Sequence, residues 1–413
     1  MPPSHIAYYI SSDNLGHAAR ASQLCNCFLL VDNTVSITLI TQVTLQSFSI
    51  FKPERVDWRQ VKVESTVVHH SLYELDVSQS IANLICLEQD VIMAREISWL
   101  GEHGVDLVLV DAPHLPCLAA SKVGIMCVLV TNFGFAEVFS YFQGMTDGKP
   151  ETKMRLDVAV GSMIKAYHCA DLWMRLPGWL PNPGFLRTTL PSSTWIVDDK
   201  LELGIENNIF PPYSVSNPSY ERKIVDTPLL ARPPTGISET DLFKALGIPT
   251  QLFGNRVLLL LLQITSHPPQ IPPNWICVTL WTPKIPLPNG YFVAPSDLHT
   301  PDIIKISSCV LGRLGYGAVS EAIAAGVPYV YVPKPYFIGE YSLRHLVETW
   351  PGYEGRAERL ETQKFEDGLW WPTVLELVSR KKKGEDSPCV ADNGEFIRQT
   401  IIEEWDHWQH SRN

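Results

Sequence analysis

The chain has 413 residues, of which 45% are hydrophobic, 10% aromatic and 19% charged. This composition supplies a sizeable core and excludes a wholly disordered protein, and the length predicts two or three domains. The 33 basic and 44 acidic residues give a net charge of −11. We therefore do not expect a surface that binds nucleic acid by neutralising its phosphates.

The nine cysteines show no metal-binding or redox spacing. The longest uninterrupted apolar runs, such as Val257–Leu262, have six residues. A membrane-spanning helix needs about 20. The first residues also lack the basic and apolar segments of a secretory signal. These features predict a soluble, cytoplasmic protein with no transmembrane segment and no metal site.

In the first half of the chain, short apolar runs alternate with segments of helical periodicity. The runs lie at 6–10, 35–40, 105–110, 125–130 and 172–175. The first helical segment begins at Gly16, and three others cover 79–100, 115–122 and 154–170. Continuous apolar strands separated by helices predict a parallel sheet that is covered on both faces.

A second alternating block follows a proline-rich stretch at about 177–249. Its expected strands lie at 257–262, 275–280, 291–293, 309–311 and 328–332, and its expected helices at 318–325 and 395–408. We predict an α/β fold of two Rossmann-like domains whose parallel sheets face a central cleft. The first domain covers 1–225, with the linker at its end, and the second covers 226–413, with the closing helix.

Residues that can act in acid–base catalysis follow two strands of the first domain. Gly16 and His17 open a helix directly after Ile6–Ile10, and Asp111 follows another buried strand. In a doubly wound sheet, such strand ends border the ligand crevice. A neutral His can accept a proton from a hydroxyl, and an acid can hold the imidazole by its Nδ1 proton. The alternative is that His17 caps a turn and Asp111 starts the turn before Pro113.

A glycine-rich segment lies between a strand and a helix of the second domain. It contains Gly312, Gly315 and Gly317. Bare backbone at a helix start can approach a diphosphate closely. Glu321 lies one turn into the helix, where a carboxylate can accept hydrogen bonds from a ribose diol. The spacing is not the G-x-G-x-x-G fingerprint, and Glu321 can also be an exposed helix residue.

In these places the sequence resembles nucleotide-sugar glycosyltransferases of the GT-B type, which have two Rossmann-like domains. The resembling stretches are Ile6–Arg20, Trp99–Phe133, Ala170–Pro183 and Tyr291–Tyr336. Within that class, Val130–Phe133 and Asp171–Gly178 are similar to the glycosyltransferase-like N-terminal part of L-arabinokinase.

The resemblance implies inverting transfer of a hexosyl group from a UDP-type sugar to an unknown acceptor. It implies that His17 is the general base and that Asp111 orients it. It assigns donor binding to Gly16, Gly312, Gly315, Gly317, Ser320, Glu321 and Glu340. No metal or other cofactor is implied, because a helix dipole and backbone amides stabilise the leaving diphosphate in this family.

Three loops depart from the family pattern. Asp13-Asn14-Leu15 stands where relatives have His-Gly-Phe, and Gln263–Pro269 replaces a Gly-Gly loop. Phe337–Tyr341 replaces paired acids and a proline. Bulky side chains and prolines hinder close approach of the backbone to a ligand. A non-catalytic nucleotide-sugar-binding or regulatory module is therefore the alternative function, and a sugar-phosphate epimerase is a third.

A kinase function is not expected. The chain after Pro333 is too short for the kinase part of L-arabinokinase, and no G-x-x-x-x-G-K-[ST] phosphate loop occurs.

Overall fold

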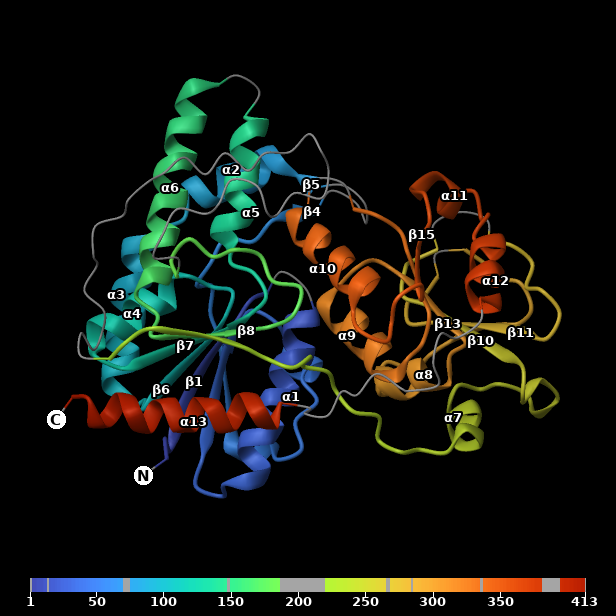
Figure 1. Ribbon diagram of the computed structural model, residues 1–413, viewed down its shortest axis with the longest axis horizontal. Coiled ribbons are helices and arrows are strands. Elements are labelled where there is room, and N and C mark those ends of the chain that lie inside the picture. Colours follow the sequence, from blue (N-terminus) through green and yellow to red (C-terminus); the bar gives the residue numbers. More distant parts are fainter. Residues whose placement is uncertain are drawn as a thin grey trace. The chain divides into compact units, whose positions relative to one another are not determined.

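A computed structural model describes residues 2–12, 15–69, 75–146, 149–185, 220–264, 268–283, 285–334, 337–380 and 394–412. Expectations for Asp13, Asn14, residues 265–267 and Tyr336 lie outside these ranges. The chain divides into two compact units (Figure 1). The first contains the described residues of Met1–Leu230, Tyr336–Ser342 and Asp392–Asn413, and the second those of Ala231–Pro335 and Leu343–Ala391.

In the described residues, the first unit is built on a seven-stranded parallel sheet in the order β3-β2-β1-β6-β7-β8-β9. The strands are β1 (His5–Ile10), β2 (Ser36–Thr41), β3 (Val56–Gln60), β6 (Leu107–Asp111), β7 (Met126–Thr131), β8 (Leu172–Arg175) and β9 (Lys223–Asp226). The short strands β4 (Val68–His69) and β5 (Leu75–Asp76) pair separately as an antiparallel ribbon. The direction of chain progression reverses between β1 and β6, which is the topological switch point of a Rossmann sheet.

Helices cover both faces of this sheet. They are α1 (Leu15–Val31), α2 (Val77–Ile85), α3 (Gln89–Glu102), α4 (Leu115–Val123), α5 (Phe135–Phe142), α6 (Pro150–His168) and α13 (Glu395–His410). α3, α4 and α6 pack together, and α13 packs beside α1 (Figure 1). Right-handed crossovers place α1 and α4 on opposite faces. The central strands are buried on both sides, which explains their continuous apolar sequence.

The described part of the second unit is built on a six-stranded parallel sheet in the order β12-β11-β10-β13-β14-β15. Its strands are β10 (Arg256–Leu260), β11 (Trp275–Thr279), β12 (Tyr291–Val293), β13 (Cys309–Gly312), β14 (Tyr329–Tyr331) and β15 (Ala357–Arg359). Its helices are α7 (Glu239–Ala245), α8 (Thr300–Ile306), α9 (Tyr316–Ala325), α11 (Thr362–Glu366) and α12 (Trp371–Ser379). α10 (Ile338–Thr349) starts in the stretch that groups with the first unit. The prediction of two Rossmann-like parallel sheets is confirmed.

One predicted helix is wrong in its extent. We expected a continuous helix over 79–100, but α2 ends at Ile85 and α3 begins at Gln89. The apolar stripe that contains Ile81 and Leu84 would continue at residue 88, where the chain has Glu88. After the break, α3 has its own set of buried residues, Ile92, Glu96 and Leu100.

The closing helix also differs from the expectation, because α13 groups with the first unit rather than the second. Its apolar stripe is buried, and it consists of Ile397, Ile401, Trp405 and Trp408. Glu404 accepts hydrogen bonds from Tyr220 (2.7 Å) and from the Lys223 ammonium (2.8 Å). Apolar burial and these polar contacts fix α13 beside α1 and β7.

Candidate functional site

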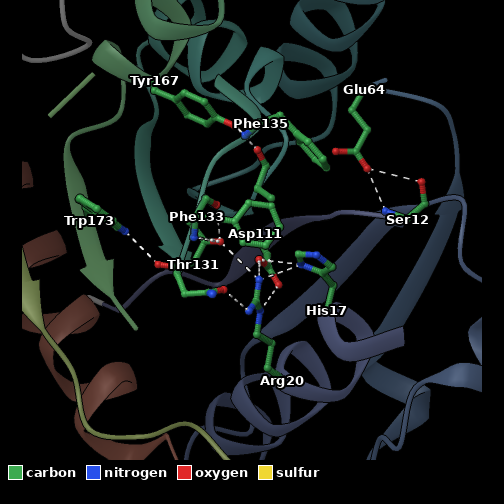
Figure 2. A network of polar contacts seen from close by, with 12 residues as sticks. Ser12, His17, Arg20, Glu64, Asp111, Thr131, Phe133, Phe135, Tyr167 and Trp173 are labelled. Carbon is green, nitrogen blue, oxygen red and sulfur yellow. Dashed lines mark hydrogen bonds and ion pairs between the residues drawn. The ribbon is translucent and has the colours of Figure 1, made fainter. Parts of the chain in front are cut away.

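The switch point of the first sheet brings His17 and Asp111 together. Asp111 is the last residue of β6 and lies opposite Ile10 in the register between β1 and β6. His17 lies in the first turn of α1, which follows β1 after a short loop. Both side chains are buried, and His17 Nδ1 lies 3.0 Å from Asp111 Oδ1 (Figure 2). The fold therefore places these two predicted residues side by side.

Arg20 is the third member of this cluster and is not among the predicted site residues. Its Nε donates to Asp111 Oδ2 at 2.6 Å, and its Nη2 donates to Asp111 Oδ1. Burial alone would raise the pKa of Asp111, but the charges and hydrogen bonds of Arg20 and His17 lower it to about 2. Asp111 is thus a carboxylate at neutral pH. The spacing of three residues between His17 and Arg20 puts both on one face of α1, and this signal was available in the sequence.

The contacts of Arg20 indicate which nitrogen of His17 carries the proton. Nη2 of Arg20 has two hydrogens, and its acceptors are Asp111 Oδ1 and Thr131 Oγ1 (3.3 Å). His17 Nδ1 lies 2.8 Å from the same Nη2. Because both hydrogens of Nη2 have oxygen acceptors, we assign the imidazole proton to Nδ1, from which it is donated to Asp111. The lone pair of His17 is then on Nε2, where it can accept a proton.

The end of β7 completes the network around Arg20. Nη1 of Arg20 donates to Asn132 Oδ1 at 2.7 Å. Thr131 Oγ1 donates to the Phe133 carbonyl at 2.8 Å, and Trp173 Nε1 donates to the Thr131 carbonyl at 3.0 Å (Figure 2). Three adjacent strands, β6, β7 and β8, therefore hold the guanidinium in one orientation.

An aromatic side chain lies against the imidazole. The rings of Phe133 and His17 are 5.7 Å apart at their centroids, in an edge-to-face arrangement. Phe133 makes similar edge contacts with Phe135 and Phe337. An apolar surround lowers the local dielectric and strengthens the hydrogen bond between His17 and Asp111.

The turn after Asp111 is strained. Ala112 has a φ of 79°, in the left-handed region that a residue with a Cβ rarely adopts. The hydroxyl of Tyr167 donates to the Ala112 carbonyl and accepts from the Phe135 amide at 2.9 Å (Figure 2). Such strain costs about 1–3 kcal/mol and persists where neighbouring contacts enforce it. Tyr167 supplies these contacts and fixes the backbone beside the carboxylate.

Two further buried titratable side chains lie close to Tyr167. The ring of His114 is 6.1 Å from the Tyr167 ring, and burial lowers the His114 pKa to about 3. Glu137, in the first turn of α5, has a pKa of about 8 because of burial. Among the described residues, the ring nitrogens of His114 and the carboxyl oxygens of Glu137 make no hydrogen bond of normal geometry. Both side chains are neutral at pH 7, and neither is among the residues predicted from the sequence.

Hydrogen bonds hold Ser11 and Ser12, the described residues of the loop after β1. The Ser11 amide donates to the Asp111 carbonyl at 3.1 Å. The Ser12 amide donates to Glu64 Oε1 at 2.8 Å (Figure 2). Glu64 is buried, so these contacts hold Ser11 and Ser12 in place. Gly16, predicted to bind the donor, lies in this unit with His17 and not with the other predicted donor-binding glycines.

The predicted donor-binding glycines of the second unit lie in different surroundings. Gly312 is the last residue of β13, and a Cβ there would lie 2.6 Å from the Tyr329 hydroxyl. Packing inside the unit therefore requires this glycine. Gly315 is the N-cap of α9, and a Cβ there would meet none of the described atoms within 4 Å. Gly315, but not Gly312, leaves open space at the start of the helix.

Two further predicted donor-binding residues lie on α9. Ser320 is buried, and its hydroxyl donates to the Gly317 carbonyl at 2.9 Å. Glu321 is also buried, and its Oε1 accepts a hydrogen bond from Arg232 Nε at 2.7 Å. The alternative of an exposed Glu321 is therefore wrong, because it is buried in an ion pair.

Glu340 is the remaining predicted donor-binding residue. It lies in the first turn of α10, in the stretch that groups with the first unit. Its amide donates to the Phe337 carbonyl at 2.9 Å, and the Phe337 ring contacts Phe133. The predicted donor-binding residues are thus divided between the two units.

Within the described ranges, no group of three or more His, Cys, Asp or Glu side chains has the arrangement of a metal site. None of the described helices combines the length and apolar character that a membrane crossing requires.

Comparison with known sequences finds a relative that aligns over most of this chain. No protein-family model matches the chain. It is 26% identical over 410 residues to L-arabinokinase from Arabidopsis thaliana. The alignment covers 96% of this chain and 34% of the plant protein, so the chain spans about a third of the length of that relative.

Solved glycosyltransferases share the fold. The glycotransferase of kitacinnamycin has a TM-score of 0.54 at 14% identity, over 100% of this chain and 98% of that one. CalG4, the calicheamicin glycosyltransferase, has a TM-score of 0.54 at 17% identity, over 98% of each chain. A UDP-glucosyltransferase from Polygonum tinctorium has a TM-score of 0.53 at 12% identity, over 98% of this chain and 99% of that one. The chain therefore has the GT-B glycosyltransferase fold.

Proposed function

We propose that this chain is an inverting, metal-independent glycosyltransferase that moves a hexosyl group from a UDP-type sugar to a hydroxyl acceptor. The fold supports the proposal, and one observation carries it. His17 and Asp111 form a buried pair at the switch point of the first sheet, with Nε2 of the imidazole left as the basic nitrogen.

The reaction follows from the roles of these side chains. His17 Nε2 takes the proton of the acceptor hydroxyl while the hydroxyl oxygen forms a bond to the anomeric carbon. The bond from that carbon to the diphosphate oxygen breaks, and its electron pair leaves with the nucleoside diphosphate. Attack opposite the leaving group inverts the configuration. Asp111 accepts the Nδ1 hydrogen bond throughout and stabilises the imidazolium that forms.

The second unit supplies the donor site in this proposal. The start of α9 presents backbone amides and the positive end of the helix dipole beside Gly315. These groups favour the charge that develops on the leaving diphosphate, so no metal ion is required. Glu321, one turn further along α9, binds the ribose diol.

Replacing the base tests the proposal. We expect His17→Ala to lower turnover by about 10²–10⁴-fold, because a positioned general base contributes that much. Donor affinity should change by less than about twofold, since His17 contacts the acceptor. The assay measures nucleoside diphosphate release from a panel of nucleotide sugars, with pooled hydroxylated acceptors, and calorimetry gives donor affinity.

His103→Ala is the matched control. His103 ends α3 and precedes β6, so it lies at the opposite end of the strand from Asp111. It should keep normal turnover. If His17→Ala also turns over at the normal rate, His17 is not the base.

A second candidate function is nucleotide-sugar binding without transfer. It is favoured by the pairing of Asp111 with both Arg20 and His17. The two hydrogen bonds from Arg20 compensate the carboxylate charge, which leaves less of it to stabilise an imidazolium. This candidate predicts that the wild-type chain binds nucleoside diphosphates but consumes no donor, even by slow hydrolysis.

A further inference from the structure

Arg232 approaches the carboxylate that the proposed function assigns to the donor ribose. Its Nε donates to Glu321 Oε1 at 2.7 Å, although the two residues are 89 positions apart. The side chains are 16% and 3% exposed. Both residues belong to the second unit. This ion pair is therefore an internal feature of the unit that carries α9.

The backbone around Arg232 is fixed on α8. The Pro233 carbonyl accepts a hydrogen bond from His299 Nε2 at 2.9 Å. The Thr235 amide and hydroxyl donate to the two carboxyl oxygens of Asp302 at 2.7 and 2.8 Å. α8 in turn packs against α9, which carries Glu321. The guanidinium thus reaches Glu321 from a segment that three hydrogen bonds hold in place.

The ion pair involves one nitrogen of the guanidinium and one oxygen of the carboxylate. Among the described residues, the hydrogen bond between Arg232 Nε and Glu321 Oε1 is the contact that joins these two side chains. An isolated buried carboxylate is costly, and the guanidinium compensates its charge. Among the described residues, Oε2 of Glu321 and the Nη groups of Arg232 make no hydrogen bond to each other, so an acceptor and several donors remain for a ligand. A diol has the complementary pattern, because each hydroxyl both donates and accepts.

We propose that Arg232 is a positioning residue for the donor, which holds the Glu321 carboxylate in the orientation that binds a ribose diol. The ligand class is a ribonucleoside diphosphate with free 2′ and 3′ hydroxyls. The inference rests on the proposed function, since that function assigns Glu321 to the ribose. It adds a second side chain to the donor site, from a segment with no glycine-rich or other nucleotide-binding motif.

Calorimetry on the full chain tests the proposal. UDP, ADP, GDP and CDP are titrated first, and the tightest binder is then compared with its 2′,3′-dideoxy counterpart. We expect Arg232→Met to weaken ribonucleotide binding about tenfold, the effect of losing one charge-assisted hydrogen bond. Binding of the dideoxy nucleotide should change by less than about threefold, because it has no diol to lose.

Further variants separate positioning from folding. Arg232→Lys should restore part of the affinity, and Glu321→Gln should cause about the same loss as Arg232→Met. The double variant should lose no more than either single one, because both act through the same contact. Arg344→Met is the matched control, since it removes an Arg from an exposed ion pair with Glu348 in the same unit.

Each result has a definite meaning. Equal weakening of both nucleotides by Arg232→Met would show that the ion pair only supports the fold, and would overturn the proposal. Tighter ribonucleotide binding would overturn it as well, because Arg232 would then compete with the diol. If the wild-type chain binds none of the four nucleotides, this inference and the proposed function both fail. If it binds them and the Arg232 variants do not discriminate, only this inference fails.

Discussion

At high pH, Glu137→Gln should make the first unit more stable than it is in the wild type. Glu137 is 5% exposed, and burial raises its pKa from 4.5 to about 8, although the nearby amides of Gly134 and Glu137 lower it by a smaller amount. In the unfolded chain this carboxyl group ionises near its ordinary value. Between pH 4.5 and 8 the folded state therefore binds one proton more than the unfolded state, and the free energy of unfolding falls as the pH rises.

The size of this effect follows from the two pKa values. The interval covers about 3.5 pH units, and each unit corresponds to 1.36 kcal/mol, so at most about 5 kcal/mol is lost by pH 8. Gln has nearly the same shape and no charge. At pH 5 we expect Glu137→Gln to change the stability little, and at pH 8.5 to raise it by up to that amount.

Native-state hydrogen exchange is the suitable assay, because it reports the opening of each unit separately. Exchange of the β7 amides, measured by mass spectrometry from pH 5 to 8.5, gives the free energy of opening of the first unit. Glu151→Gln, at the exposed start of α6, is the control for removing a carboxyl group. A difference between wild type and Glu137→Gln that stays constant with pH would refute the reasoning.

Three other substitutions test interactions inside each unit. Asp111→Asn should cost about 3–5 kcal/mol at pH 7, because it leaves the buried Arg20 without its carboxylate. In the wild type, the lowered pKa of Asp111 means that the free energy of unfolding should fall by about 2.5 kcal/mol between pH 3.8 and pH 2. Urea denaturation across this pH range should show this loss only when Asp111 is present. Gly312→Ala should lower the stability of the second unit by about 1–3 kcal/mol, since its Cβ meets the Tyr329 hydroxyl; an unchanged thermal midpoint would contradict this. Trp405→Ala should cost the first unit about 3–5 kcal/mol and expose α13 to limited proteolysis, whereas unchanged protease resistance would show that α13 is held by other contacts.

The sequence predicts the central strands of both sheets because they are buried on two faces. β1, β6 and β7 therefore read as continuous apolar runs. The edge strands β3 and β9 were not predicted, because they contain only half-buried and exposed residues, several of them charged. Their position comes from pairing with a neighbouring strand, which local periodicity does not encode.

The site was predictable where it depends on strand ends. His17 and Asp111 each follow a buried strand, and parallel strands present such residues at one edge of the sheet. Arg20 was available from its helical spacing. The pairing of Arg232 with Glu321 was not predictable, because the residues are far apart in sequence and Arg232 lies in a proline-rich segment without periodicity. Long-range contacts of this kind depend on how α8 and α9 pack.

The position of α13 has a consequence for biosynthesis. The ribosome makes β1 and α1 before the second unit, but the helix that covers α1 and β7 emerges only after the entire second unit. The first unit must therefore wait with an uncovered apolar face while the second unit, whose sheet residues are nearly contiguous, can already fold. Chaperone binding to nascent chains should concentrate on that face and end when the segment around residue 410 has left the exit tunnel.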